Sequence, residues 1–170
     1  GTMSVPEALR ARRSQRDFSV SPLSMAELGQ LAWAAQGVTA RDRGLRTAPS
    51  AGALYPLELY FLVPQGVLHY LPLTHRFERK GQRDLREPLS RAALDQPAVS
   101  HAACDVVVTS VTDRTRQKYG ERAKRYVALE AGHASQNLLL QATALGMATV
   151  PIGAFDDAAV KRLLALPSGE

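Results

Sequence analysis

Thr47-Ala48-Pro49-Ser50-Ala51-Gly52-Ala53-Leu54-Tyr55-Pro56 is a run of small, uncharged residues with two prolines, and the rest of the sequence is organised around it. Pro49 and Pro56 fix φ and remove hydrogen-bond donors, while the small side chains between them leave backbone N–H groups uncovered. Such a surface can lie against a flat or anionic ligand. The alternative is an ordinary turn that leads into a strand at Leu57. Two further segments favour the ligand-binding interpretation.

The composition indicates one globular domain over residues 4–170, because 45% of the 170 residues are hydrophobic and a chain of this length can bury a sizeable core. Gly1-Thr2 before Met3 looks like a cloning remnant and is excluded from the domain. No segment approaches the roughly 18 apolar residues that a membrane span needs, and the N-terminus lacks the features of a signal peptide. We therefore expect no membrane association and a cytoplasmic location.

The sequence predicts no metal site. A single cysteine, Cys104, excludes an internal disulfide and a cysteine-rich zinc site. His69 and His75 lack partners at the spacing that metal ligands require.

The net charge of +5 and the isoelectric point near 9.7 indicate an anionic partner. Nucleic acid is the first class to consider. However, the arginines are dispersed along the chain, without aromatic interleaving and without a motif that reads DNA. We therefore expect no nucleic-acid partner, and a phosphorylated small molecule accounts for the charge equally well.

A second informative segment follows the first predicted helix. Ser4 and Glu7 form a capping-box pattern that starts a helix reaching about Arg13. At its end, Arg12-Arg13-Ser14-Gln15-Arg16-Asp17-Phe18 places three guanidinium groups and a hydroxyl within five residues. Guanidinium groups match phosphate oxygens, so this segment is a candidate phosphate site. The alternative is a solvated basic helix end that complements the helix dipole.

The remaining pattern predicts alternating helices and strands. A capping box at Ser24 starts a helix that stops at Gly37, and residues 38–47 read as a loop. The later elements are strands at 57–63 and 67–73 in a hairpin, a charged connector over 74–82, a helix at 83–94, a central strand at 105–112 and a long helix at 121–145. The long helix carries many small and apolar residues that permit close helix packing, including against a second subunit.

The third informative segment is Ala148-Thr149-Val150-Pro151-Ile152-Gly153-Ala154-Phe155, which reads as a short strand that opens into a turn before a helix capped by Asp156. Backbone N–H groups at Gly153 and Ala154 are expected to be free for a ligand, because a loop between strand and helix cannot pair them internally. The alternative is an ordinary strand-to-helix turn.

Four segments together resemble the nitroreductase family of FMN flavoproteins, and within it most closely the SagB-type dehydrogenases. They are Arg12 to Phe18, Ala48 to Pro56, Glu130-Ala131-Gly132-His133-Ala134-Ser135-Gln136-Asn137-Leu138, and Pro151-Ile152-Gly153. The resemblance covers nearly the whole chain, in order. It implies an α+β fold with a central, mixed but mainly antiparallel sheet flanked by helices, in a homodimer with FMN at the subunit interface.

The resemblance also implies roles for the residues that were singled out on physical grounds. Residues that match the segment holding the FMN phosphate and ribityl chain are Arg12, Arg13, Ser14 and Arg16. Residues that match the segment reaching the flavin from the other subunit are Pro49, Ser50, Ala51 and Gly52. Residues that match the loop over the isoalloxazine ring, where a backbone N–H can meet N5, are Pro151, Ile152, Gly153 and Ala154.

Lys118-Tyr119 resembles a Lys-Tyr pair used by SagB-like members that oxidise azoline rings in peptides. Removing a hydride from a heterocycle requires that a neighbouring proton be taken by a base, so these are the catalytic candidates. The alternative is that Lys118 is a surface residue and Tyr119 packs under the long helix.

Three functions are consistent with the sequence. The first is an FMN-dependent oxidoreductase reduced by NAD(P)H or by its substrate, which would be a small molecule or a peptide. The second is an azoline-peptide dehydrogenase, and the third is a flavin- or anion-binding module without turnover. Family members usually continue into a last strand and tail that carries a further phosphate ligand, whereas this chain stops at Ser168-Gly169-Glu170. Either this difference weakens FMN binding or the chain is a fragment.

Overall fold

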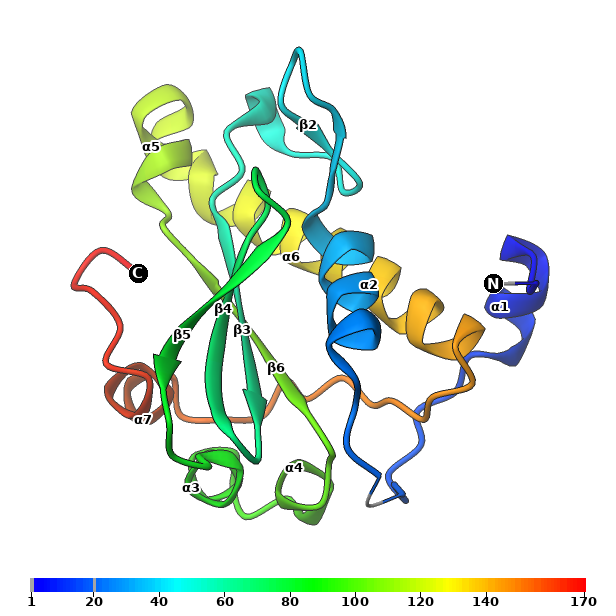
Figure 1. Cartoon of the computed structure of the whole chain (residues 1–170). Coiled ribbons are helices and arrows are strands. Elements are labelled where there is room, and N and C mark those ends of the chain that lie inside the picture. The colour runs from blue at the N-terminus through cyan, green and yellow to red at the C-terminus, as the bar shows by residue number, and fades with distance from the viewer. Residues whose placement is uncertain (1, 20) are drawn as a thin grey trace.

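The computed structural model describes residues 2–19 and 21–170, and it has an α+β architecture in which helices flank one antiparallel sheet (Figure 1). The sheet has the strand order β5-β4-β3-β6, and every neighbouring pair is antiparallel. The strands are β3 (Leu57–Val63), β4 (Gly66–Leu71), β5 (Arg76–Gly81) and β6 (Asp105–Ser110). The predicted fold class is confirmed, although the sheet itself is wholly antiparallel rather than mixed.

The two faces of the sheet pack against different helices because side chains alternate along each strand. Leu57, Leu59 and Phe61 face α2 (Met25–Gln36) and α6 (Ala123–Ala144) and form the main core with them. Tyr60 and Leu62 face the opposite way. The helices that cover this second face are α3 (Arg86–Ala92), α4 (Pro97–Ser100) and α7 (Asp157–Leu163), which gather at one end of the sheet (Figure 1).

Two helices stand apart from these layers. Helix α1 (Val5–Ala11) projects from the body near the C-terminal end of α6, while α5 (Asp113–Tyr119) lies near its N-terminal end (Figure 1). Both predicted capping boxes are confirmed. In each, the Glu side chain accepts from the backbone N–H of the capping serine at 2.7 Å, at Ser4–Glu7 and at Ser24–Glu27.

Several predicted elements differ from the structure. Residues 74–82 were expected to be a charged connector, but Arg76–Gly81 forms β5 at the edge of the sheet. Charged side chains are common on edge strands because they discourage pairing with other chains. The charged sequence of this strand therefore resembles that of a loop, and the strand was not predicted. Strand β6 was expected to be central, whereas within the described residues it is the other edge of the sheet. Its β-branched sequence fits either position.

Three further boundaries change. Residues 38–47 contain a short antiparallel pair, β1 (Val38–Ala40) with β2 (Leu45–Arg46), rather than only a loop. The helix predicted over 83–94 is present but shorter, as α3, and a separate short helix, α4, begins at Pro97. Residues 148–155 do not form a strand, and only Thr149 makes an isolated bridge.

The part of the chain that the structure describes contains no candidate membrane span and no candidate metal centre. No helix there combines the length and hydropathy needed to cross a bilayer. Nor do His, Cys, Asp and Glu side chains gather there in groups that could hold a metal ion.

Candidate functional site

Two of the three predicted ligand-binding segments lie side by side. The backbone N–H of Gln15 donates to the carbonyl oxygen of Thr149 at 2.9 Å, and Ser14 forms a parallel bridge with Thr149. The arginine segment and the loop at residues 151–154 are therefore neighbours, although they are far apart in sequence. We call residues 12–16 and 149–154 together the lower half-site.

The arginines of the lower half-site are not equivalent. Arg13 folds back on α1, where its Nη1 donates to the carbonyl oxygens of Arg10 at 2.8 Å and Arg12 at 2.7 Å. It thus satisfies carbonyls that a helix end leaves unpaired. Arg12 is half-buried and Arg16 is exposed, and neither makes an ion pair with a described residue. Arg12 and Arg16 keep their donors available for an anion.

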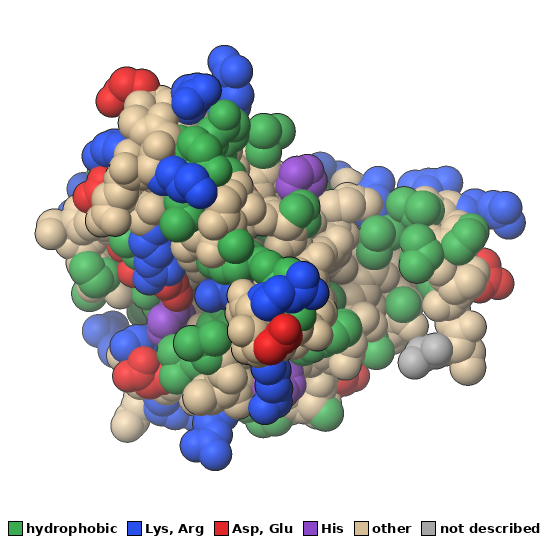
Figure 2. Space-filling model, turned by 90° about the horizontal axis from the view of Figure 1, so that it is seen from above, with side chains coloured by type: hydrophobic (Ala, Val, Ile, Leu, Met, Phe, Trp, Pro, Cys, Tyr) green, Lys and Arg blue, Asp and Glu red, His purple; other side chains and the backbone are tan. Residues whose placement is uncertain are grey.

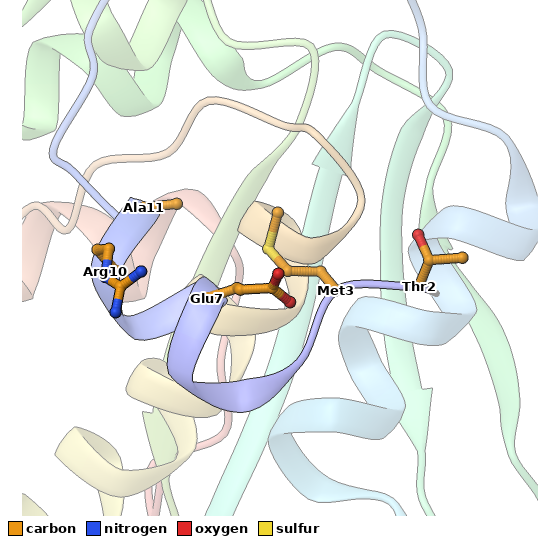
Figure 3. Close-up of a pocket in the computed structure, with 5 residues that line it drawn as sticks. All are labelled: Thr2, Met3, Glu7, Arg10 and Ala11. Carbon is orange, nitrogen blue, oxygen red and sulfur yellow. The ribbon is translucent and has the colours of Figure 1, made fainter.

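A cavity of about 590 Å³ opens beside Arg16. Its lining comes from four parts of the chain, which include Arg16 and Phe18, Pro64 at the β3–β4 turn, Arg86 at the start of α3, and His101 after α4. This volume falls in the range of small-molecule sites. A smaller hollow of about 490 Å³ lies on the outer side of α1, where Met3, Glu7 and Arg10 line it (Figure 3). It includes none of the predicted site residues.

Gln96 holds the loop of the lower half-site, and sequence reasoning did not find it. Its Nε2 donates to the carbonyl oxygen of Ala154 at 3.0 Å and to that of Ala93 at 2.8 Å. The N–H groups of Gly153 and Ala154 donate no hydrogen bond within the described chain, as expected. Pro151, Gly153 and Ala154 are exposed, while Ile152 is half-buried against the second core cluster.

The third predicted segment, residues 49–52, forms a tight turn. Ala51–Ala53 is a short 3₁₀ turn, called η1, in which Gly52 has φ of 64°, a conformation that favours glycine. The Ser50 hydroxyl accepts from the backbone N–H of Tyr55 at 2.9 Å and so closes the turn. Pro49 and Gly52 are exposed, which leaves this backbone accessible.

Lys118 and Tyr119 lie directly over this turn. A Cβ at Gly52 would stand 2.9 Å from the Tyr119 hydroxyl and 3.1 Å from the Lys118 Nζ. The predicted catalytic pair and residues 49–52 therefore form one group, which we call the upper half-site. Sequence spacing alone could not have shown this proximity.

A buried polar cluster supports the upper half-site from below. Arg46 donates from Nη1 to Gln36 Oε1 at 2.9 Å, and its guanidinium lies 4.5 Å from the centre of the Tyr55 ring. Glu130 of α6 is only 3% exposed. Burial raises the pKa of Glu130, and interactions with Ser50 and Arg46 oppose that rise. The sequence signal for this cluster was Glu130, the only carboxylate residue of α6.

Arg114 ties α5 to the sheet and to the same turn. Its Nη2 lies 2.6 Å from Glu58 Oε1, and its Nη1 donates to the carbonyl oxygen of Tyr55 at 3.1 Å. Burial alone would raise the pKa of Glu58, but hydrogen bonds from His69 and Arg114 hold that pKa below its usual value. Glu58 is therefore a stable anionic anchor for the helix that carries Lys118 and Tyr119.

The two half-sites lie at opposite ends of α6. The lower one follows its C-terminal end at Ala144, and the upper one packs against the turn that precedes Ala123 (Figure 1). At a rise of 1.5 Å per residue, the 22 residues of α6 span about 33 Å, and the upper half-site reaches along the first part of the helix to Glu130, which interacts with Ser50. One chain thus presents two separate groups of predicted ligand-binding residues.

Comparisons with known proteins agree on one family. The model of the nitroreductase family matches residues 9–170. Protein MJ1384 of Methanocaldococcus jannaschii, whose name assigns it provisionally to the nitroreductases, is 40% identical over 164 residues, which cover 93% of this chain and 82% of that protein.

Solved structures show the same fold. A crystal structure from Ralstonia eutropha, also named provisionally as a nitroreductase, superposes with a TM-score of 0.90 at 28% identity and covers 99% of this chain and 79% of that one. A structure of the Escherichia coli microcin synthetase McbBCD complex with truncated pro-MccB17 bound gives a TM-score of 0.78 at 24% identity, over 89% of this chain and 62% of that one. The chain therefore belongs to the nitroreductase family, whose members are flavin-dependent oxidoreductases.

Proposed function

We propose that this protein is an FMN-dependent oxidoreductase whose flavin lies between two copies of the chain. The observation that carries the proposal is the position of the two half-sites at opposite ends of α6. If a two-fold axis passed perpendicular to α6, the α6 helices of the two copies would pack antiparallel to each other. The upper half-site of one copy would then lie beside the lower half-site of the other, because a two-fold contact pairs unlike ends of the same element.

The outer surface of α6 supports such a contact. From Tyr126 to Ala144 the helix contains one charged residue, Glu130, and that residue is buried. The exposed positions are therefore uncharged, among them Leu129, which is 53% exposed. Val5 and Leu9 on the projecting helix α1 are also exposed. Uncharged and apolar surface of this extent is typical of an interface between subunits.

The donor set of the lower half-site fits a flavin phosphate. Arg12, Arg16 and the Ser14 hydroxyl would bind the phosphate and the ribityl chain, because charge-assisted hydrogen bonds suit a dianion. Arg13 would contribute mainly by fixing the end of α1, since its Nη1 is engaged by backbone carbonyls. FMN, when bound, supplies the hydride-transfer chemistry, and the chain supplies position and electrostatics.

The backbone segments fit the flat ring system. The free N–H groups of Gly153 and Ala154 would donate to the ring edge at N5, within the loop that begins at Pro151 and Ile152. Pro49, Ser50, Ala51 and Gly52 of the other copy would approach the flavin closely, since their side chains are small. The electron donor would be NAD(P)H or the substrate itself.

The test is a titration of the purified protein with FMN, followed in the visible spectrum and on a size-exclusion column. We expect a bound flavin at micromolar concentration and co-elution of flavin with a dimer. The absence of any flavin signal would reject the proposal. A bound flavin that neither NADH, NADPH nor an organic substrate reduces would favour a binding module without turnover.

A second candidate function is the oxidation of azoline rings in a peptide. The observation that favours it is the convergence of Lys118 Nζ and Tyr119 Oη on the exposed face of Gly52, within the segment proposed to meet the flavin. The fold is also shared with a subunit of the microcin synthetase complex. In this reaction the ring would lose a hydride to the flavin and a proton to Lys118 or Tyr119, which balances the loss of two electrons.

For this candidate we predict that Lys118→Ala abolishes oxidation of a thiazoline peptide while FMN binding is retained. Gly52→Ala should lower the same activity at least tenfold, because its Cβ would displace the Tyr119 hydroxyl and the Lys118 amine. Single-turnover flavin reduction by the peptide, followed by absorbance, measures both variants.

Gly44→Ala is the matched control for Gly52→Ala. Gly44 also has φ of 64°, but a Cβ there would meet no atom within 4 Å. Both substitutions thus carry the cost of a positive φ, and only one reaches the catalytic pair. Equal turnover in Lys118→Ala and wild type, or equal losses in the two glycine variants, would exclude the Lys-Tyr pair from the reaction.

A further inference from the structure

A second basic surface, apart from the arginines of the lower half-site, surrounds Lys118 and Tyr119. We call residues 113–125 the basic ridge; they comprise α5, the 3₁₀ turn η2 (Gly120–Arg122) and the start of α6. The ridge holds six of the 21 Lys and Arg of the chain and two of its 16 Asp and Glu. The ridge therefore carries a net charge of +4, and the rest of the chain holds 15 basic and 14 acidic residues.

Most of this charge is uncompensated. Arg114 pairs with Glu58 at 2.6 Å and Arg116 pairs with Asp113 at 2.7 Å. The other four basic residues of the ridge are exposed and make no ion pair with any residue that the structure describes; they are Lys118, Arg122, Lys124 and Arg125. Like charges this close repel one another, and an anionic partner would relieve that repulsion.

The arrangement of these cations favours an extended partner. The molecule seen from above shows more blue than red side chains, dispersed over the whole face (Figure 2). Around a helix of 3.6 residues per turn, Arg122 and Arg125 lie about 60° apart on one face, while Lys124 lies about 100° from Arg125 and points to a different side. A compact phosphate is held by converging donors, whereas an extended chain of carboxylates can contact donors that spread.

The contact between Tyr119 of the ridge and Tyr126, which directly follows the ridge, favours a peptide over a single-stranded nucleic acid. Tyr119 and Tyr126 pack edge to face, with ring centres 4.9 Å apart at 83°. Each ring is therefore engaged by the other, whereas proteins that bind single strands present free aromatic faces for bases to stack on.

We propose that the basic ridge docks an acidic segment of a peptide substrate and thereby brings that peptide to Lys118 and Tyr119. The identity of the docked chain as a substrate rests on the second candidate function above, whereas the docking itself does not require flavin. Binding and turnover can therefore be measured separately.

The test is fluorescence anisotropy with a labelled 16-residue peptide of alternating Glu and Gly, with and without FMN, at about 50 mM and 300 mM NaCl. We expect saturable binding that weakens at the higher salt, because screening reduces attraction between exposed charges. The triple variant Arg122→Glu, Lys124→Glu, Arg125→Glu should bind at least about tenfold more weakly, since three attractive contacts become repulsive.

The matched control is Arg83→Glu, Arg91→Glu, Arg162→Glu, which changes the net charge equally at exposed positions on and near α3 and α7, at the other end of the sheet. We expect it to bind the peptide as wild type does. Equal losses in the two triple variants, or tighter binding of an oligothymidylate of the same charge, would overturn the proposal. If the protein binds the peptide but takes up no FMN, the proposal that the ridge docks an acidic peptide is supported and the proposed flavin function is rejected.

Discussion

Replacing both Arg12 and Arg16 by alanine is expected to weaken FMN binding by about 10² to 10⁴-fold. Each charge-assisted hydrogen bond contributes about 1.5 to 3 kcal/mol, and a tenfold change corresponds to about 1.4 kcal/mol. Both arginines are free of ion pairs in the described chain, so their donors are available to the phosphate. Quenching of FMN fluorescence on binding measures the affinities.

Arg13→Ala is the control for that result. Because the Arg13 guanidinium is held by the carbonyls of Arg10 and Arg12, its removal should affect FMN affinity much less than the double substitution does. Circular dichroism checks that each variant remains folded. A loss of affinity in Arg13→Ala as large as that in the double variant would contradict the assignment of phosphate binding to Arg12 and Arg16.

Asp105→Asn is expected to change how stability depends on pH. Burial raises the pKa of Asp105 to about 8, and Arg86 opposes the rise only in part. Its Oδ2 atom is buried without a hydrogen-bond partner among the described residues. A carboxyl with a raised pKa in the folded state contributes stability that is complete below its unfolded pKa of about 4 and is lost as pH rises through about 8.

Wild type should therefore lose stability between pH 5 and pH 8, and the asparagine variant should lack this loss. Relative to wild type, the variant should gain up to about 4 kcal/mol over that interval, because one pKa unit corresponds to about 1.4 kcal/mol. Urea unfolding of both proteins at pH 5, 6.5, 8 and 9 measures this difference in the free energy of unfolding.

Asp84→Asn should change the pH dependence of stability in the opposite direction. Hydrogen bonds from Arg86 lower the pKa of Asp84, so its contribution is present above the unfolded pKa and is lost as pH falls. Parallel pH profiles for wild type and Asp105→Asn would show that Asp105 titrates normally.

Local chemistry made much of the fold predictable. The capping boxes at Ser4 and Ser24 depend on residues three positions apart, so the sequence contains all of their information. Strand β5 was missed because the charges of an edge strand look like those of a loop, and β6 was misplaced because β-branched residues suit edge and centre alike. Whether a strand lies at the edge or in the centre of a sheet depends on which strands become its neighbours, and a local sequence pattern does not contain that information.

The candidate site was predictable in its segments but not in their grouping. The small residues around Gly52 and the arginines around Ser14 were visible from composition, whereas the contact of Gly52 with Tyr119 and the bridge of Ser14 to Thr149 join distant parts of the chain. Gln96 gave no local signal either, because its role is to bind the carbonyl of Ala154. The roles proposed for these residues remain predictions until flavin binding is measured.

In the proposed enzyme, the length of helix α6 would fix the spacing between the two half-sites. Its 22 residues set the distance between the half-sites, and in a two-fold pair the same length sets the gap at both flavins. Inserting one residue would add about 1.5 Å and rotate everything beyond it by about 100°, which would misalign both centres at once. Loops elsewhere can lengthen freely, but this helix could change only by compensating shifts at both of its ends.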